Sequence, residues 1–201
     1  MKAFLSMCFL FVLVSSDVWH QCYRHIYRGR GVSEFCSIGE DSCISNFTRF
    51  NLDDMIIKTE RWGCTSDCTP GDYSFTTLED IYFRRRIHCC QGNKCNNQSA
   101  PGSDPPYNGL VCPGCISSSF EDCQDSETVR CRGEENLCIE FVMAYYGFNH
   151  SDMAFKGCAT RDFCTLARAS VAYDYIFDKI KQAQCCHTAE PPTLKSKEVQ
   201  P

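Results

Sequence analysis

Cysteine is the residue that most constrains this chain, because 18 of its 201 residues are Cys. Cytosolic proteins keep their thiols reduced, whereas this density is close to that of extracellular domains held together by disulfides. A unit of fewer than about 100 residues buries little apolar surface and commonly needs such crosslinks. The chain is therefore expected to fold as one or more disulfide scaffolds.

The cysteine spacing repeats once along the chain. Six cysteines recur after 94 to 96 residues: Cys36, Cys43, Cys64, Cys68, Cys89 and Cys90 return as Cys131, Cys138, Cys158, Cys164, Cys185 and Cys186. A fixed period means that one structural unit occurs twice. The segment between the copies is rich in Pro, Gly, Ser and Asn, as linkers are. We expect a first domain at residues 20–97, a linker at 98–109, a second domain at 110–188 and a polar tail at 189–201.

The N-terminus has the layout of a secretory signal peptide, with Lys2, an apolar run over residues 3–14 and small residues at 15–16. We expect cleavage after Ser16, so that residues 1–16 are removed. The run is too short to cross about 30 Å of hydrocarbon, and the polar C-terminus lacks the apolar tail of a lipid-anchor signal. The mature protein is expected outside the cell without a membrane anchor, with candidate glycosylation sites at Asn46, Asn97 and Asn149.

Period-two alternation of apolar and polar residues predicts β-hairpins in both copies. In the first, residues 44–50 and 55–62 flank the turn-rich segment 51–54. In the second, Ile139, Phe141 and Met143 share one face, and the chain returns through residues 154–158. The Ala-rich segment 166–181 fits a helix as well as a strand, and the sequence leaves that choice open.

Charge and motifs argue against several functions. A net charge of −5 leaves no basic surplus for a nucleic acid backbone. Five scattered histidines among disulfide-spaced cysteines do not resemble a zinc site, and no Gly-x-Ser-x-Gly elbow occurs. The run Cys112-Pro113-Gly114-Cys115 follows a linker rather than a strand that feeds a helix, which disfavours a thiol-redox site. The chain is expected to be no enzyme and to need no cofactor or metal.

Two charged clusters remain for interpretation. Arg84-Arg85-Arg86 is expected to be a solvated strand edge that discourages aggregation. The second copy carries more acidic than basic residues, with clusters at Glu121-Asp122 and Glu134-Glu135. These acids fit either plain solvation or contact with a basic partner, and the sequence leaves both open.

The first copy resembles the snake-toxin type of three-finger domain, above all in its ending over residues 89–96 (CCQGNKCN). The two copies together resemble the gamma-type phospholipase A2 inhibitors, with local matches at residues 86–90 (RIHCC), 108–113 (NGLVCP), 131–133 (CRG) and 156–158 (KGC). The resemblance implies an all-β chain of two tandem, disulfide-rich three-finger domains, the second of the urokinase-receptor (Ly-6 antigen) type. It also implies that Asn96 closes the last loop by hydrogen bonding.

Eight cysteines alone permit 105 pairings. The resemblance implies one set: Cys22 with Cys43, Cys36 with Cys64, Cys68 with Cys89, Cys90 with Cys95, Cys112 with Cys138, Cys115 with Cys123, Cys131 with Cys158, and Cys164 with Cys185. Cys8 leaves with the signal peptide, and Cys186 is left over because the second copy lacks the last cysteine. An odd cysteine predicts a free thiol or an intermolecular bridge, and hence a possible homo-oligomer.

The resemblance implies a secreted, non-catalytic protein that inhibits secreted phospholipase A2 by steric sequestration. A secreted three-finger signalling ligand, such as a pheromone or a receptor modulator, is the alternative, and a carrier protein is a third. In this fold the exposed finger tips are expected to bind the partner. The candidate contacts in the first domain are Arg28, Arg30, Phe50, Leu52 and Met55.

The sequence departs from the family in two further places. The first finger, between Cys22 and Cys36, lacks the extra disulfide that the family usually has there, so we expect it to be freer. The linker keeps Pro101, Pro105 and Pro106, but its other residues are polar where the family has an apolar segment implicated in enzyme contact.

Overall fold

The computed structural model describes residues 20–24, 31–52, 55–123, 127–144, 152–169 and 179–191. The predicted signal peptide, the tip residues Arg28 and Arg30, the sequon at Asn149 and most of the C-terminal tail lie outside these ranges. Over the described ranges, no helix is both long and apolar enough to cross a bilayer.

The described residues form strands almost throughout. In the first copy these are β1 (Gln21–Tyr23), β2 (Ser33–Phe35), β3 (Ser42–Leu52), β4 (Met55–Thr65), β5 (Gly71–Thr76) and β6 (Tyr82–Cys90), with a short 3-10 turn η1 (Leu78–Asp80) before β6. In the second they are β7 (Tyr107–Ser117), β8 (Glu127–Arg132), β9 (Leu137–Ala144), β10 (Asp152–Ala159) and β11 (Lys179–Thr188), with helix α1 (Arg161–Arg168) before β11. The predicted hairpins are confirmed as β3–β4 and β9–β10, each antiparallel.

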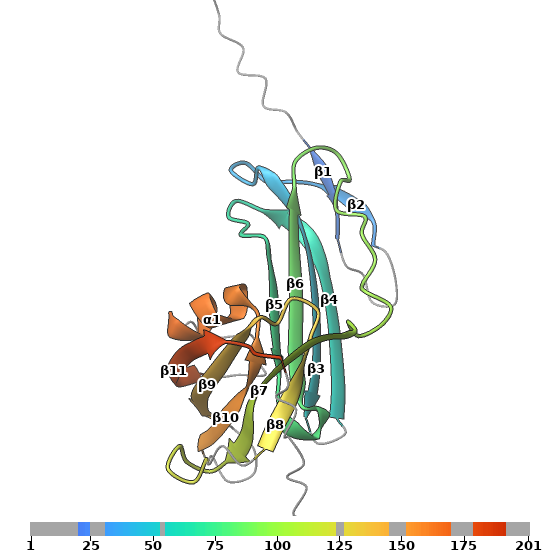
Figure 1. Cartoon of the computed structure of the whole chain (residues 1–201). Helices are drawn as coiled ribbons and strands as arrows, with labels where there is room; N and C mark the ends of the chain where they lie inside the picture. The colour runs from blue at the N-terminus through green and yellow to red at the C-terminus, as the bar shows by residue number, and fades with distance from the viewer. Residues whose placement is uncertain are drawn as a thin grey trace, which may run out of the picture.

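The strands of both copies join in one nine-stranded sheet, while β1 and β2 form a separate pair. The main order is β11-β9-β10-β5-β6-β3-β4, with β7 paired to β10 and to β8. Figure 1 shows the long strands of the first copy standing beside the shorter strands of the second. The expected all-β fold is confirmed, and the two copies share backbone hydrogen bonds in addition to the linker.

The two copies also share one apolar core. Phe50, Phe75 and Phe83 come from the first copy, and all three are at most 3% exposed. Phe75 packs against Phe141 of the second copy with ring centroids 4.8 Å apart, and against Phe163 at 5.6 Å. Aromatic contacts of this kind add stability beyond the area that they bury. The interface between the copies therefore resembles the interior of a single domain.

A glycine permits the sheet to pass from one copy to the other. Along one side of β10, residues 154–156 pair with β7 and residues 158–159 pair with β5. Gly157 lies between these two pairings, and a Cβ added there would be 2.1 Å from the carbonyl oxygen of Thr76. Only a residue without a side chain fits this crossing, which gives a physical reason for Gly in the run 156–158 (KGC).

Thr160 joins β5 to the start of the helix. Its hydroxyl accepts from Ser74 N at 3.0 Å, donates to Asp72 O at 2.8 Å and caps α1 by accepting from Phe163 N. The helix ends at Arg168 and β11 begins at Lys179, so segment 166–181 contributes to both kinds of structure.

Disulfides cross-link both copies near one end of their strands. The described residues contain eight: Cys22–Cys43, Cys36–Cys64, Cys68–Cys89, Cys90–Cys95, Cys112–Cys138, Cys115–Cys123, Cys131–Cys158 and Cys164–Cys185. These are the pairs that the family resemblance implies. The fully buried Asn96 binds Tyr23 and Ile44 through three hydrogen bonds of 2.9 Å, which confirms that it closes the last loop.

Candidate functional site: a cationic groove beneath the linker

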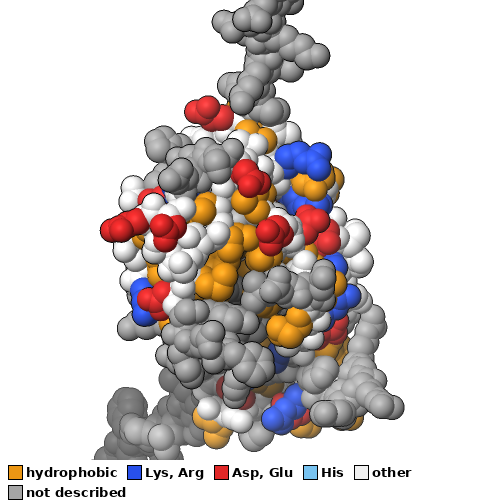
Figure 2. Space-filling view, turned by 90° about the horizontal axis from the view of Figure 1, so that it is seen from below, with side chains coloured by type: hydrophobic (Ala, Val, Ile, Leu, Met, Phe, Trp, Pro, Cys, Tyr) orange, Lys and Arg blue, Asp and Glu red, His pale blue; other side chains and the backbone are white. Residues whose placement is uncertain are grey.

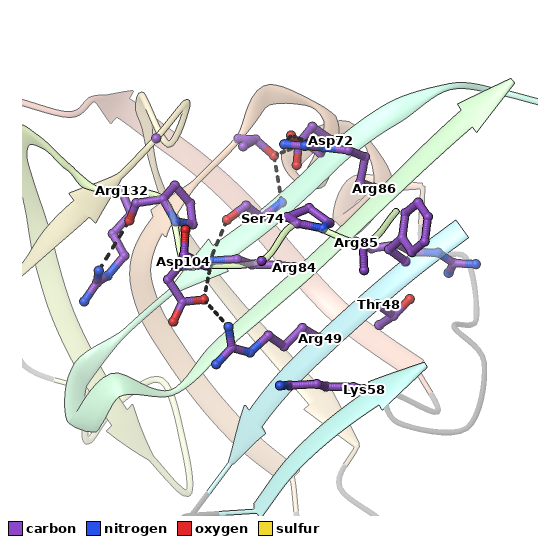
Figure 3. Close-up of a pocket in the computed structure, with 18 of the residues that line it drawn as sticks. Thr48, Arg49, Lys58, Asp72, Ser74, Arg84, Arg85, Arg86, Asp104 and Arg132 are labelled. Carbon is purple, nitrogen blue, oxygen red and sulfur yellow. Dashed lines mark hydrogen bonds and ion pairs between the residues drawn. The ribbon is translucent and has the colours of Figure 1, made fainter. Parts of the chain in front are cut away.

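A groove of about 690 Å³ lies between the linker and one face of β3, β4, β5 and β6. Linker residues 100–106 form one wall, and residues 132–134, after β8, close one end. Figure 3 shows Arg49 and Arg84 of the sheet directed toward Asp104 of the linker, and Arg86 beside Asp72. The volume is within the range of small-molecule sites.

Strand alternation decides which side chains face the groove. Arg49 on β3 lies directly opposite Lys58 on β4 and Arg84 on β6, so these three residues share one face of the sheet. Arg86 follows two residues after Arg84 and faces the same way. Arg85 faces the other way, where its Nε donates to Asn46 at 3.3 Å. The run of three arginines is therefore divided between the two faces.

Acidic side chains neutralise part of this basic face. Arg49 Nη1 lies 2.9 Å from Asp104 Oδ1, and Arg86 Nη2 lies 2.6 Å from Asp72 Oδ2. Arg84 Nε is 3.9 Å from the same Asp104 oxygen, and its guanidinium stands 4.6 Å from the ring centroid of Tyr82. Asp104 therefore ties the linker to two neighbouring strands of the sheet.

A buried carboxylate beside the groove connects the two copies. Glu135, from the turn after β8, is 0% exposed. Its Oε1 accepts from Ser74 and Thr76 of β5 and lies 3.4 Å from Arg84 Nη1. Its Oε2 accepts from Arg132 N at 2.9 Å. One carboxylate of the second copy thus satisfies three polar side chains of the first.

Burial shifts both members of this ion pair toward their neutral forms. It raises the pKa of Glu135, and the opposing effects of Arg84 and of the hydrogen bonds are smaller. Burial likewise lowers the pKa of Arg84, against the opposing pull of Glu135 and Asp104. The penalty for removing these charges from water therefore exceeds their mutual attraction, as is common for buried ion pairs.

Some polar groups of the basic face lack partners. Lys58 is exposed and forms no ion pair with any described residue. Arg49 Nε and Arg84 Nε are buried without a hydrogen-bond acceptor among the described residues. Buried N–H groups normally find an acceptor, so these two nitrogens are exceptions on the basic face.

The structure corrects the predicted tip contact at Phe50. This residue is 3% exposed because β3 turns it onto the face that carries Phe75 and Phe83, against the second copy. Met55, at the start of β4, is 52% exposed and available for contact. The side chain of Leu52 lies outside what the structure describes, as do Arg28 and Arg30.

Three interpretations of single polar residues also change. Arg84 is no solvated edge residue, because β6 lies between β5 and β3 and the Arg84 side chain is only 13% exposed. Glu135 is unavailable to a basic partner, since Arg84 and β5 already bind it. Asn46 is 8% exposed and engaged by Arg85, which argues against a glycan there. Asn97 is exposed and stays a predicted glycosylation site.

The remaining cysteine prediction concerns Cys186. Its backbone belongs to β11, but its side chain lies outside what the structure describes, so a free thiol or a bridge stays a prediction. Cys112 and Cys115 belong to two separate disulfides, with Cys138 and Cys123, which fits a structural role for the Cys-Pro-Gly-Cys run.

Comparison with known proteins identifies two matching regions. The u-PAR/Ly-6 domain matches residues 20–98 and again residues 108–190. "Phospholipase A2 inhibitor 1" of Protobothrops flavoviridis is 31% identical over 168 residues, 79% of this chain and 82% of that protein. "Phospholipase A2 inhibitor PIP" of Malayopython reticulatus is 27% identical over 204 residues, 95% of this chain and 98% of that protein. The similarity therefore extends over both copies and the linker.

Proposed function

Since this chain belongs to the u-PAR/Ly-6 domain family, in two tandem copies, we propose that it is an extracellular inhibitor of secreted phospholipase A2. The observation that carries the proposal is similarity at about 30% identity, over most of both chains, to proteins named phospholipase A2 inhibitors. The inhibitor acts by covering the enzyme and performs no catalysis. Secretion is supported by the eight disulfides, because disulfides persist in oxidising compartments. We propose that residues 1–16 are removed as the signal peptide during secretion.

Fusion of the two copies supports inhibition by steric coverage. A partner that binds a preformed surface does not have to order it, so little affinity is lost to ordering. Here the β10–β5 pairing and the shared aromatic core hold both copies as one body. A surface that spans both copies is therefore available before the enzyme arrives.

The tip of the β3–β4 hairpin is the part of the described surface that we propose for enzyme contact. Met55 and Ile56 are each 52% exposed there. Asn51, which pairs with Ile56, donates to Asp80 O at 2.9 Å and so brings the exposed side chains of Glu79 and Asp80 close to the tip. Figure 2, seen from below, shows apolar side chains with acidic and some basic side chains around them on the underside of the molecule. Such a surface complements a basic protein with an apolar patch. Contact of the enzyme with Arg28 and Arg30, at the predicted tip of the first finger, is also part of the proposal.

The test is hydrolysis of phospholipid vesicles by secreted phospholipases of several groups, with and without excess protein. We expect the rate to fall for at least one group. The double substitution Met55→Ser with Ile56→Ser should weaken inhibition about tenfold or more, as the loss of an apolar contact at the centre of an interface does. The matched control is Ile38→Ser, because Ile38 is 92% exposed and lies in the turn before β3, at the opposite end of that strand.

Two outcomes count against the proposal. Unchanged hydrolysis for every phospholipase group would overturn the inhibitor function and leave the signalling ligand as the better hypothesis. Equal losses of inhibition in the tip variant and in the Ile38→Ser variant would overturn the tip as the contact. A pull-down from the native fluid then identifies the partner directly.

A further inference from the structure

We propose that the groove beneath the linker binds a small anionic amphiphile, a carboxylate or phosphate head group on a hydrocarbon chain. The chain as a whole has a net charge of −5, yet six Lys and Arg residues line the groove against four Asp and Glu residues, and all of these cations except Arg85 have side chains on its side of the sheet or at the end of β8. Locally positive sites on an acidic protein concentrate anions. This inference does not depend on phospholipase inhibition.

A row of three like charges across the sheet is the strongest indication of an anion. Lys58, Arg49 and Arg84 stand in direct register on β4, β3 and β6, and Figure 3 shows them side by side. Like charges directly opposite one another destabilise a sheet unless something compensates them. Asp104 lies against Arg49 and Arg84, but Lys58 has no acidic partner among the described residues. The positive charge of the row is therefore compensated at its Arg49 and Arg84 end and not at Lys58.

Asp104 shows which chemistry the row accepts. Its carboxylate lies 2.9 Å from Arg49 Nη1, the short distance of a charge-assisted hydrogen bond. A second carboxylate or phosphate beside Lys58 would complete the row on its open side. The distal end of Arg86 is committed to Asp72, so the expected head-group position lies between Lys58 and Arg49.

The rest of the groove is suited to a hydrocarbon chain. Phe47 and the linker residues Pro101, Pro105 and Pro106 line it together with the aliphatic stems of the basic residues. A volume of about 690 Å³ accepts a single lipid-sized molecule and not a folded partner. The combination of one uncompensated cation with apolar walls selects an amphiphile over a simple salt anion.

The test is isothermal titration of the full, disulfide-bonded protein at pH 7 with four probes. Oleate and oleoyl lysophosphatidate, below their micelle concentrations, carry the two anionic head groups. Monoolein keeps the hydrocarbon chain without charge, and inorganic phosphate keeps the charge without a chain. We expect both anionic lipids to bind at least tenfold more tightly than either control probe. Equal binding of monoolein would overturn the role of the cations, and equal binding of phosphate would overturn the amphiphile.

Two variants of one strand locate the site. Lys58→Gln removes a cation that faces the groove, and Arg61→Gln removes one from the opposite face of β4. Both residues are exposed and both changes reduce the charge equally, so neither should disturb folding. We expect Lys58→Gln to weaken binding of oleate about tenfold, the effect of one charge-assisted contact, and Arg61→Gln to leave it unchanged. Equal affinities of the two variants, or no binding of either lipid, would overturn the proposal.

Discussion

Replacement of Glu135 tests whether the buried polar contacts hold the two copies together. In Glu135→Ala, Arg84 loses its partner inside the interface, and Thr76 and Arg132 N lose acceptors at 2.8 and 2.9 Å. Removing one member of a buried ion pair costs about 3–5 kcal/mol, and the hydrogen-bond losses overlap with this figure instead of adding to it. We expect a loss of about 3–5 kcal/mol in the free energy of unfolding.

A comparison of two substitutions separates charge from hydrogen bonding. Because burial raises the pKa of Glu135, the neutral carboxyl is the form that the folded state tolerates better. Glu135→Gln is neutral and similar in shape, and it keeps an acceptor for Ser74 and Thr76. It should therefore destabilise the protein less than Glu135→Ala does. The matched control is Glu134→Ala, since Glu134 is the exposed neighbour.

Thermal and urea unfolding with the disulfides intact measures these effects. A protein of this length shifts its Tm by roughly 2–4 °C per kcal/mol, so Glu135→Ala should lower Tm by about 6–20 °C. The double substitution Arg84→Met with Glu135→Leu should recover most of the loss, because it removes both buried charges. The reasoning is refuted if Glu135→Ala unfolds within about 0.5 kcal/mol of the natural protein or of the Glu134→Ala control.

Three further predictions concern the same framework. Gly157→Ala places a Cβ 2.1 Å from Thr76 O and should destabilise the protein by about 2 kcal/mol or more in urea unfolding. Gly63→Ala is the control, because Gly63 has open space around it and its replacement should not destabilise the protein. Equal effects of the two substitutions would contradict the close approach of Gly157 to β5. Because the pKa of Glu135 is raised on folding, its stabilising contribution is complete below the unfolded pKa of about 4.3 and is lost as pH rises through the folded pKa. The free energy of unfolding, measured between pH 3 and 8, should therefore fall less steeply with pH for Glu135→Gln than for the natural protein. Asn96→Ala leaves three backbone groups without partners and should cost about 1–3 kcal/mol in urea unfolding, and full retention of stability would show that the loop closes without it.

Cysteine spacing and residue alternation made the framework predictable from the sequence. The repeat of six cysteines at 94 to 96 residues defined two copies of one unit, since loop lengths between crosslinks are a property of the chain itself. Alternation predicted the β3–β4 and β9–β10 hairpins because neighbouring strands in a hairpin are neighbours in sequence. Family resemblance supplied the pairing of cysteines, which spacing alone leaves open.

The fusion of the copies was decided by tertiary structure alone. The pairing of β10 with β5 involves two residue pairs and the adjacent Gly157. So short a contact leaves no pattern in a single sequence from which it could be predicted. Alternation shows that the two faces of a strand differ, but it does not show what covers each face. For that reason Phe50 was predicted at an exposed tip and lies in the shared core, and Glu135 was predicted at the surface and lies buried against Arg84.

The sequence by itself therefore determined the repeat and the hairpins, because these depend on distances along the chain, while the pairing of the cysteines came from the family resemblance. Only the tertiary structure placed Arg84 and Arg86 on the linker side and Arg85 on the other, and set Lys58, Arg49 and Arg84 in one row beneath Asp104. Such a row forms across strands in register, and register between distant segments is decided by packing.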